Sequence, residues 1–298
     1  MDSLAVLLAL GATLCWGSTW VLLKLGVDRM DWIGFGVLRP WMGLLIIIPY
    51  AAATGALQFP SPYLILTAMF GGLLNIYLGN VLFFYALSRG PLHEATLLSN
   101  TSPLWGVLSA VLILGEPARW VTFAAGALVI AGAYFLVRRS KGGRQASEHS
   151  IVPRLAALTT GLFWGFSAAV PTKYCLSHGM SPITYQFLFL CGAAIAWSLT
   201  AIPGFVKGRF RYTGRVLWIG FGSAFLGLFA SWLLWLTALA RADASVLSPL
   251  YGLAPLLTVM MSVVFLRERP TARTALGGLL VLAGAIMFGL FGCNSGEF

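Results

Sequence analysis

Ten long stretches of apolar residues follow one another along the chain and constrain its fold more than any other feature. An α-helix needs about 20 apolar residues to cross the roughly 30 Å hydrocarbon layer of a bilayer. The stretches lie at residues 4–25, 32–54, 63–87, 92–114, 119–137, 153–176, 181–203, 214–239, 244–266 and 272–292. Only 9% of the 298 residues are charged, which is too few to cover a water-soluble surface. The sequence therefore predicts an all-α integral membrane protein with ten transmembrane helices.

The chain also contains the same unit twice. Residues 86–133 align without a gap with residues 238–285, and 17 of the 48 pairs are identical. The match extends more weakly to the start of each half, where Leu14-Cys15-Trp16-Gly17 faces Leu162-Phe163-Trp164-Gly165. Repeats in membrane transporters commonly enclose a substrate site at their interface. The duplication therefore predicts two structural halves with a shared site between them.

We divide the chain into a first five-helix repeat at 1–137, a linker at 138–152 and a second five-helix repeat at 153–292. Because each repeat has an odd number of spans, the second repeat is expected to be inverted relative to the first, with a central cavity between them. Every second loop is rich in basic residues, namely Lys24, Arg29, Arg89, Arg138, Arg139, Lys141, Arg144, Arg154, Lys207, Arg209, Arg211, Arg215, Arg267, Arg269 and Arg273. The positive-inside rule makes these loops cytoplasmic and places both termini outside.

Two prolines at equivalent positions of the repeats, Pro103 and Pro255, lie inside the fourth and ninth apolar stretches. Proline removes a backbone hydrogen bond and kinks a helix, and the freed carbonyls must face protein or a wet cavity. We expect paired kinks at these prolines to gate the cavity. Gly17 and Gly165, which follow the tryptophan of each half, are assigned to the same gate.

Polar and aromatic side chains within the apolar stretches are the candidates for the wall of this cavity. We expect it to be lined by Trp16, Asn75, Tyr77, Asn80, Ser99, Asn100, Trp164, Tyr185, Gln186, Trp232, Ser248 and Tyr251. The alternative for each Asn or Ser is a hydrogen bond between helices worth less than about 2 kcal/mol, and for the tryptophans it is packing. The gathering of these residues near the two prolines favours the cavity.

The ionisable residues bear on the substrate. No Asp or Glu lies in the middle of an apolar stretch. Because a proton-coupled exporter of cations usually needs such a carboxylate, we expect a neutral or zwitterionic substrate and weak or no ion coupling. Arg39 is the one basic residue deep in a stretch. It either extends to the membrane surface or pairs with a substrate carboxylate.

The sequence shows no catalytic residues and no cofactor or metal site. Nucleotide-binding, zinc-protease and serine-hydrolase motifs are absent, and the short loops leave no room for a catalytic domain. The histidines and cysteines lack metal-ligand spacing. The basic residues lie between spans, so nucleic acid is not an expected partner. The expected partners are a small-molecule substrate and membrane lipid, and the oligomeric state stays open, a monomer included.

Four motifs recur in register in the two halves. They are Trp-Gly at 16–17 and 164–165, Pro-Leu at 103–104 and 255–256, Leu-x-Glu at 114–116 and 266–268, and a Gly followed by Ala-Gly at 126–132 and 278–284. Together they resemble the repeat of the EamA-type branch of the drug/metabolite transporter superfamily, and the resemblance covers essentially the whole chain. It implies a bacterial inner-membrane transporter that exports amino acids and related small metabolites through a central cavity by alternating access. The aromatic interior is similar to that of aromatic amino acid exporters of this branch.

Several relatives in this branch place both termini in the cytoplasm, whereas the loop charges of this chain predict the reverse, and we follow the charges. Two other functions remain open. Multidrug efflux is disfavoured by the missing carboxylate in the middle of the spans. A membrane-embedded enzyme or a scaffold is disfavoured because the spans hold no nucleophile with its base and no set of metal ligands.

Overall fold

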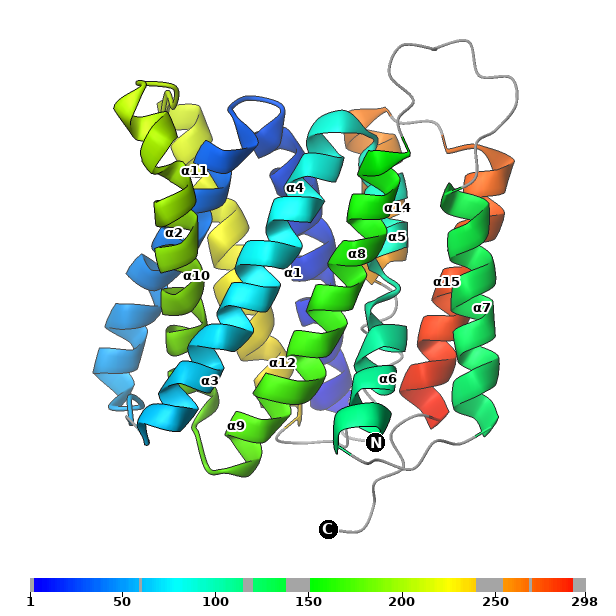
Figure 1. Ribbon diagram of the computed structural model, residues 1–298, viewed down its shortest axis with the longest axis horizontal. Helices are drawn as coiled ribbons and strands as arrows, with labels where there is room; N and C mark the ends of the chain where they lie inside the picture. Colours follow the sequence, from blue (N-terminus) through cyan, green and yellow to red (C-terminus); the bar gives the residue numbers. More distant parts are fainter. Residues whose placement is uncertain are drawn as a thin grey trace.

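The computed structural model describes residues 3–58, 61–114, 120–137, 151–239, 254–267 and 270–291. Every regular element within these ranges is a helix (Figure 1). Seven helical runs among them are long and apolar enough to cross a membrane: Leu7–Val27, Trp32–Thr54, Pro62–Arg89, Leu92–Ile113, Val152–Ser177, Pro182–Val206 and Gly214–Trp235. Shorter apolar helices cover Ala124–Phe135 and Ala272–Gly284. The prediction of an all-helical membrane protein is confirmed, and the predicted stretch at 244–266 lies partly outside the described residues.

The helices of the first half follow the predicted stretches closely. They are α1 (Ser3–Val27), α2 (Trp32–Thr54), α3 (Pro62–Gly72), the π-helical segment η1 (Leu73–Gly79), α4 (Asn80–Arg89), α5 (Leu92–Ser99), α6 (Ser102–Leu114) and α7 (Trp120–Val137).

The second half follows a similar order, but its first span is interrupted by a π-helical segment that α1 lacks, and the counterpart of α5 lies outside the described residues. Its helices are α8 (Val152–Ser167), the π-helical segment η2 (Ala168–Thr172), α9 (Lys173–Ser177), α10 (Pro182–Val206), α11 (Gly214–Ala224), the π-helical segment η3 (Phe225–Ala230), α12 (Ser231–Leu239), α14 (Ala254–Leu266) and α15 (Ala272–Phe291).

Side-chain caps fix where the second helix of each half begins. Oδ1 of Asp31 accepts a hydrogen bond from the backbone N–H of Ile33 at 3.0 Å at the start of α2. Oγ of Ser181 accepts one from the N–H of Thr184 at 3.1 Å at the start of α10. Each bond satisfies an N–H that has no partner within the helix. The two caps therefore mark equivalent positions of α2 and α10.

Two irregular features recur at the same positions of the repeat. The π-helical segments η1 and η3 begin 152 residues apart, at Leu73 and Phe225. The helices α6 and α14 begin at Ser102 and Ala254 and have the same length of 13 residues. Since π-helical segments are rare and often occur at functional sites, their recurrence points to a shared feature of both halves.

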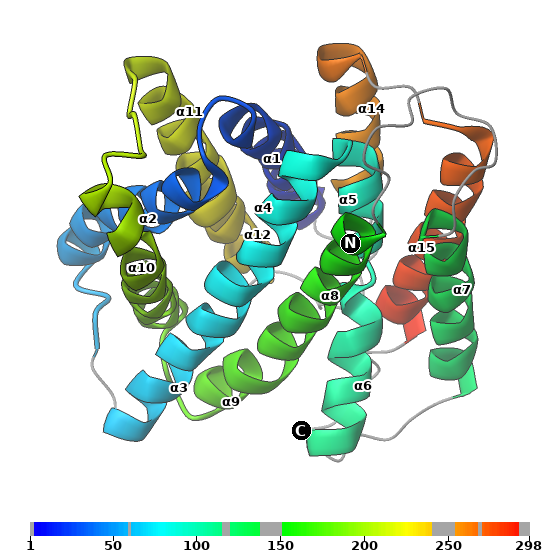
Figure 2. The ribbon, with the colours of Figure 1, turned by 45° about the horizontal axis from the view of Figure 1, so that its top comes forward.

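The helices of the two halves exchange partners in a regular way. The helix α1 packs against α12 and α14, whereas α8, its counterpart, packs against α4 and α6. The pairs α2 with α10 and α7 with α15 join helices that are each other's counterparts (Figures 1 and 2). In Figure 1, α1 rises from the lower edge and α8 descends from the upper edge. These contacts are those expected of a duplicated unit.

The largest buried cluster lies where α1, α2, α4 and α10 meet, and it is rich in aromatic side chains. We name Trp20, Phe35, Phe83, Phe84 and Trp197 the aromatic core. The ring centroids of Phe84 and Trp197 are 5.9 Å apart, and those of Trp20 and Phe83 are 6.1 Å apart. Lipid tails are as apolar as these side chains, so the hydrophobic effect does not drive the helices together. Close packing of this kind holds membrane helices together instead.

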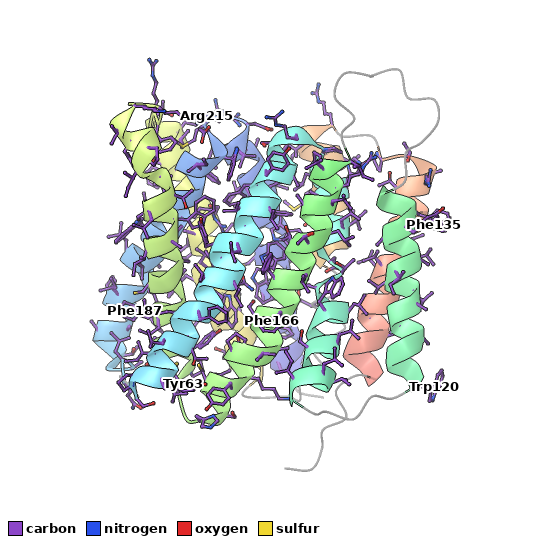
Figure 3. All side chains as sticks on the ribbon, viewed as in Figure 1. Tyr63, Trp120, Phe135, Phe166, Phe187 and Arg215 are labelled. Atoms are coloured by element: carbon purple, nitrogen blue, oxygen red, sulfur yellow. The ribbon has the colours of Figure 1, made fainter. Side chains whose placement is uncertain are left out.

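The two edges of the helix bundle differ in their side chains. Arg215 lies at the upper edge in Figure 3, and Tyr63 and Trp120 lie at the lower edge. Trp120 is 78% exposed, as expected for a tryptophan that faces lipid headgroups. In the loop between α10 and α11, the hydroxyl of Tyr212 donates to the carbonyl oxygen of Gly34 at 3.1 Å, and burial raises the pKa of Tyr212 to about 12.

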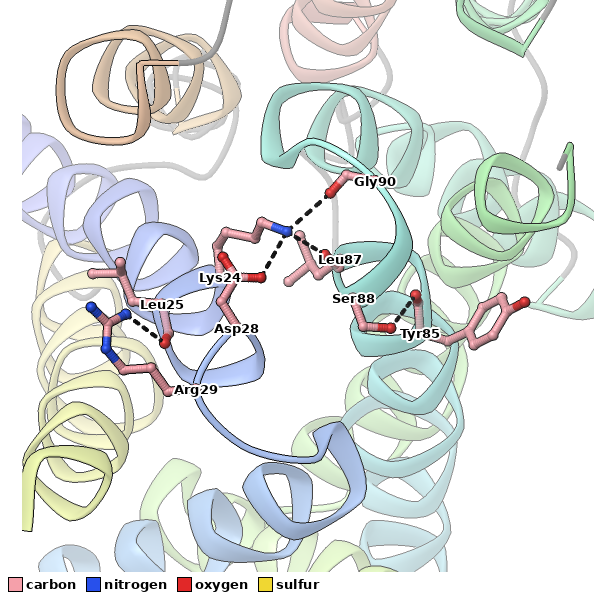
Figure 4. Close-up of polar contacts among 8 residues, drawn as sticks. All are labelled: Lys24, Leu25, Asp28, Arg29, Tyr85, Leu87, Ser88 and Gly90. Carbon is pink, nitrogen blue, oxygen red and sulfur yellow. Dashed lines mark hydrogen bonds and ion pairs between the residues drawn. The ribbon is translucent and has the colours of Figure 1, made fainter. Parts of the chain in front are cut away.

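Lys24 near the end of α1 holds this helix to the turn between α4 and α5 (Figure 4). Its Nζ donates to the carbonyl oxygens of Leu87 at 2.6 Å and Gly90 at 3.2 Å. The same Nζ pairs with the carboxylate of Asp28 at 3.0 Å. Lys24 is therefore an anchor at the edge of the bundle.

Candidate functional site

The predicted gate residues come together in two equivalent helix contacts. A Cβ on Gly165 in α8 would overlap the carbonyl oxygen of Ser102 at the start of α6. A Cβ on Gly17 in α1 would lie 3.3 Å from the carbonyl oxygen of Ala254 at the start of α14. Both glycines let a helix backbone reach the first turn of the helix that carries the predicted proline.

The prolines themselves occupy the second position of their helices. Pro103 follows Ser102 in α6, and Pro255 follows Ala254 in α14. Proline is tolerated there because the N–H of the first helical turn has no partner within the helix. The fourth apolar stretch is broken at this point, since α5 ends at Ser99 and α6 begins at Ser102. The expected kink is thus a break between two helices in the first half.

Trp164 is joined to the π-helical segment η1. Its indole Nε1 donates to the carbonyl oxygen of Asn75 at 3.2 Å. Its ring also packs on Phe83 at 5.1 Å and Trp20 at 6.1 Å between centroids. Trp164 therefore borders the aromatic core. Trp16, its counterpart in α1, packs edge-on against Trp235 of α12 at 5.9 Å.

The polar residues of η1 bond to neighbouring helices. Nδ2 of Asn75 donates to Oγ of Ser167 in α8 at 2.7 Å. The hydroxyl of Tyr77 shares a hydrogen bond of 2.6 Å with Oγ1 of Thr200 in α10. The ring of Tyr77 stands edge-on to Trp197 at 5.4 Å, which extends the aromatic core toward η1. Asn80, at the start of α4, is buried with 4% of its surface exposed.

The break between α5 and α6 holds two further predicted residues. Ser99 is fully buried, and its Oγ donates to the carbonyl oxygen of Thr96 at 3.1 Å. Asn100 is 4% exposed, and its Nδ2 has no hydrogen-bond partner among the described residues. A buried amide without a partner is costly. The amide of Asn100 therefore makes the break between α5 and α6 a polar site inside the helix bundle.

Tyr185 in α10 lies in a second buried cluster, apart from the aromatic core, and its neighbour Gln186 is also buried. The hydroxyl of Tyr185 shares a hydrogen bond of 2.6 Å with Oγ1 of Thr172. Nε2 of Gln186 lies 3.5 Å from the carbonyl oxygen of Leu228, and its Oε1 has no partner within the described part of the chain. The structure therefore does not bring these two residues together with Trp164.

Three further predicted residues are placed differently. Trp232 lies in α12 and is half-buried, next to the π-helical segment η3. Ser248 and Tyr251 lie outside the described residues.

Arg39 is the residue for which the sequence left two roles open. The structure buries it, with 4% of its surface exposed, so its side chain does not extend to the membrane surface. Its Nε donates to Oγ of Ser223 in α11 at 3.2 Å, and its Nη2 lies 3.4 Å from the carbonyl oxygen of the same residue. The guanidinium carbon is 6.0 Å from the centroid of Phe84. Arg39 therefore borders the aromatic core.

The acidic residues in the described part of the chain are Asp28, Asp31 and Glu94, and each of them lies at or near the end of a helix. They form ion pairs with Lys24, Arg209 and Arg154, respectively. None of these pairs reaches the interior, so Arg39 has no carboxylate partner among the described residues.

Two hollows open between helices at the outer surface of the bundle. One has a volume of about 430 Å³ and lies between α2, α10 and α11, with Trp41, Ser198 and Phe205 in its lining. The other has a volume of about 290 Å³ and lies between α6, α7 and α8, with Trp105, Ile130 and Tyr134 in its lining. Neither is lined by a predicted site residue.

Sequence reasoning missed several residues that complete this arrangement. Trp20, Phe83, Trp197 and Thr200 contact the predicted residues Trp164 and Tyr77 directly. An apolar side chain in an apolar stretch carries no signal of its own. Trp197 and Thr200 did carry a signal, because an aromatic and a polar residue stand within the seventh predicted stretch, 181–203.

Comparison with known proteins gives the family. Residues 3–138 and 153–290 each match the EamA-like transporter family. A protein of Streptantibioticus cattleyicolor named "Probable terminal-alkyne amino-acid exporter" is 25% identical over 91% of this chain and 89% of its own length. A protein of Escherichia coli K12 named "Probable amino-acid metabolite efflux pump" is 23% identical over 95% of this chain and 94% of its own length.

Other relatives carry different names. A "Riboflavin transporter" of Rhizobium johnstonii is 30% identical over 67% of this chain and 62% of its own length. A solved structure titled "Crystal structure of protein" superposes with a TM-score of 0.66, covers 96% of both chains and is 22% identical, so it shows the fold alone. Because the family match covers both halves of the chain, this multi-pass membrane protein is a transporter and belongs to the EamA-like transporter family.

Proposed function

We propose that this protein exports amino acids, including aromatic ones, and related small metabolites across the bacterial inner membrane by alternating access. The observation that carries the proposal is the pair of equivalent contacts at the gate, Gly17 against Ala254 and Gly165 against Ser102. Each joins the first helix of one half to the helix that carries the proline in the other half. Two equivalent crossings of this kind allow one half to rock against the other around a fixed site.

The proposed site lies beside the aromatic core, where η1 meets α8 and α10. In the arrangement described here, Asn75 bonds to Ser167 and Tyr77 bonds to Thr200. We propose that the substrate replaces these bonds between helices when the halves move apart. The indole of Trp164 and the ring of Tyr77 would then contact an aromatic or apolar part of the substrate. We propose that the remaining predicted residues line the path of the substrate through the membrane. They are Trp16, Asn80, Ser99, Asn100, Tyr185, Gln186, Trp232, Ser248 and Tyr251.

The proposed architecture is ten transmembrane helices in two inverted five-helix repeats around a central cavity. The opposite courses of α1 and α8 in Figure 1 and the exchange of partners between the halves support it. So does the recurrence of the π-helical segments η1 and η3. The division at 1–137, 138–152 and 153–292 and the position of both termini outside the cell belong to the same proposal.

The charges of the described interior support a zwitterionic substrate. The acidic residues described, Asp28, Asp31 and Glu94, are held in ion pairs near helix ends. An exporter of lipophilic cations usually needs a carboxylate inside the membrane to bind them. We therefore propose facilitated or weakly ion-coupled transport of amino acids, and we rank multidrug efflux second.

Transport in proteoliposomes tests the proposal. Purified protein would be reconstituted with a high internal concentration of phenylalanine, and the entry of labelled phenylalanine by exchange would be measured against protein-free vesicles. The same assay would be run with leucine, with threonine and with a lipophilic cation. We expect exchange of amino acids and none of the cation. Exchange of the cation alone would favour multidrug efflux, and the absence of any amino acid flux would remove the proposal.

A further inference from the structure

We propose that Arg39 binds the carboxylate of the transported molecule, so that the substrates are restricted to solutes that carry a carboxylate. This inference rests on the proposed export of amino acids, and it adds the chemical group that the protein recognises. It follows from four observations about Arg39: its burial, its partners, its counterpart in the other half and its position beside the aromatic core.

Arg39 is a buried cation within a membrane span. It is the eighth residue of α2, so it lies about 12 Å along the helix from the cap at Asp31. Only 4% of its surface is exposed. A charged side chain at such depth is costly unless it has a partner, and residues of this kind usually mark a substrate or ion pathway.

The partners of Arg39 leave part of its charge and hydrogen-bonding capacity unused. Its Nε and Nη2 both contact Ser223, which is a neutral residue. Its Nη1 has no hydrogen-bond acceptor among the described residues. A guanidinium has five N–H donors arranged to bind a carboxylate with two parallel bonds. The site is therefore built to accept an anion on its open edge.

The equivalent contact in the other half shows that the fold does not need an arginine here. The caps at Asp31 and Ser181 are 150 residues apart, so Phe189 of α10 is the counterpart of Arg39. Phe189 is buried against Gly71 of α3, and a Cβ on this glycine would lie 3.4 Å from its ring. Gly71 in turn is the counterpart of Ser223 at the repeat offset of 152. The same crossing is thus made by a phenylalanine and a glycine in one half and by an arginine and a serine in the other.

The surroundings of Arg39 suit an amino acid with an apolar or aromatic side chain. The helix α2, which carries Arg39, packs against both α4 and α11, which carry Phe84 and Ser223 (Figure 2). Phe84 contacts Trp197, and Trp197 contacts Tyr77 of the proposed site. A carboxylate on Arg39 would therefore place the rest of the solute against aromatic rings. The cation without a carboxylate partner and the rings together define the two ends of a binding site.

The first experiment uses the wild-type protein and competing solutes. Exchange of labelled phenylalanine would be measured in proteoliposomes with increasing amounts of three competitors. Unlabelled phenylalanine keeps both charged groups, phenylalaninamide lacks the carboxylate, and 3-phenylpropionate lacks the ammonium group. We expect phenylalaninamide to compete at least about tenfold more weakly than phenylalanine, because it loses two charge-assisted hydrogen bonds. We expect 3-phenylpropionate to remain an effective competitor. Equal competition by phenylalanine and phenylalaninamide would overturn the inference.

The second experiment uses variants of Arg39. In Arg39→Gln, the preference for phenylalanine over phenylalaninamide should fall to about twofold or less, whereas Arg39→Lys should keep part of it because the charge remains. Arg29→Gln is the matched control, since Arg29 is an exposed cation just after α1 whose side chain, among the described residues, bonds only to the carbonyl oxygen of Leu25. This control should behave like the wild type. An Arg39→Gln protein that keeps the full preference would contradict the inference, and if this variant does not fold, the wild-type series decides alone.

The two proposals fail in different ways. If wild-type vesicles exchange no amino acid, the proposed function is wrong. The carboxylate site is then judged by the melting temperature of the purified protein with 3-phenylpropionate, which should rise in the wild type and stay unchanged in Arg39→Gln. If wild-type vesicles exchange phenylalanine but do not distinguish it from its amide, the export function stands and the role of Arg39 is wrong.

Discussion

Gly165 packs directly against the backbone of Ser102, so that α8 and the start of α6 touch without an intervening side chain. The Cβ position of Gly165 also lies only 2.7 Å from the backbone nitrogen of Gly106. Backbone atoms cannot move aside as a flexible side chain can. This contact is therefore one of the least adaptable in the proposed gate, and it leads to the first prediction.

Replacement of Gly165 by alanine should destabilise the protein by about 1–3 kcal/mol, because the new methyl group overlaps backbone atoms of α6. Gly17→Ala should cost less, since the nearest atoms lie 3.2 Å and 3.3 Å away. The melting temperature in detergent and the exchange rate in vesicles measure both effects. Gly222→Ala is the control, because its Cβ would lie 3.6 Å from a leucine methyl group, an ordinary contact distance. An unchanged melting temperature in Gly165→Ala would show that the two helices separate freely.

Removal of the hydroxyl of Tyr77 should lower transport more than stability. Tyr77→Phe keeps the edge-on ring contact with Trp197 but loses the hydrogen bond to Thr200. In membrane proteins such bonds average about 0.6 kcal/mol, so the melting temperature should change little. We expect a clear fall in the exchange rate if the hydroxyl contacts substrate. Tyr63→Phe, an exposed tyrosine at the edge of the bundle (Figure 3), should have no effect.

Asn75 and Ser167 should act as a coupled pair. A cycle of Asn75→Ala, Ser167→Ala and the double variant measures the energy of their 2.7 Å hydrogen bond. We expect the two single changes to add up to more than the double change, by about 0.5–1.5 kcal/mol in unfolding free energy. Strict additivity would mean that the bond contributes nothing and that each residue acts alone.

The ion pair between Glu94 and Arg154 should fasten α5 to α8. Two bonds of 2.9 Å and 3.3 Å join the carboxylate to the guanidinium, and both side chains are mostly buried. Glu94→Gln should lower stability by about 1 kcal/mol, and the loss should shrink at high salt because ions screen a pair at the membrane surface. The exchanged pair, Glu94→Arg with Arg154→Glu, should recover part of the stability. If the exchanged pair recovers no stability, the surroundings of each side chain, and not the ion pair, determine the effect of these residues on stability.

Reporter fusions test the proposed orientation in the membrane. A periplasmic reporter attached after Phe298 should be active, because the basic loops are expected on the cytoplasmic side and the C-terminus on the other. The same reporter in the loop at Gly208, between Lys207 and Arg209, should be inactive. The reverse result at both sites would reverse the orientation and leave the fold unchanged.

The helices were predictable from the sequence because each stretch is continuous and long enough to cross a membrane. The predicted end of the second stretch, Thr54, is the end of α2, and the apolar run at 63–87 became α3, η1 and α4. The π-helical turns were not predictable, since no residue type at 73–79 requires one. Such a turn depends on what the neighbouring helices offer the backbone.

The candidate site was predictable only in part. Trp164 and Tyr77 were found because a polar or aromatic residue stands out in an apolar stretch, and both do border the aromatic core. Tyr185 stands out for the same reason but lies in another cluster, because sequence spacing within one helix says nothing about which helices meet. The depth of Arg39 was also undecided, since a long side chain has several ways to reach water until its neighbours are known.

The wide turns at Leu73–Gly79 and Phe225–Ala230 have a consequence for how the later parts of their helices face their neighbours. A π-helical turn holds about one residue more than an α-helical turn, so it swings every later side chain on the helix by about 100°. Losing that extra residue from η1 or from η3 would turn the side chains of α4 or of α12 toward different neighbouring helices. Because the two segments begin at equivalent positions, the helices that follow them, α4 and α12, start with the same rotational offset in both halves.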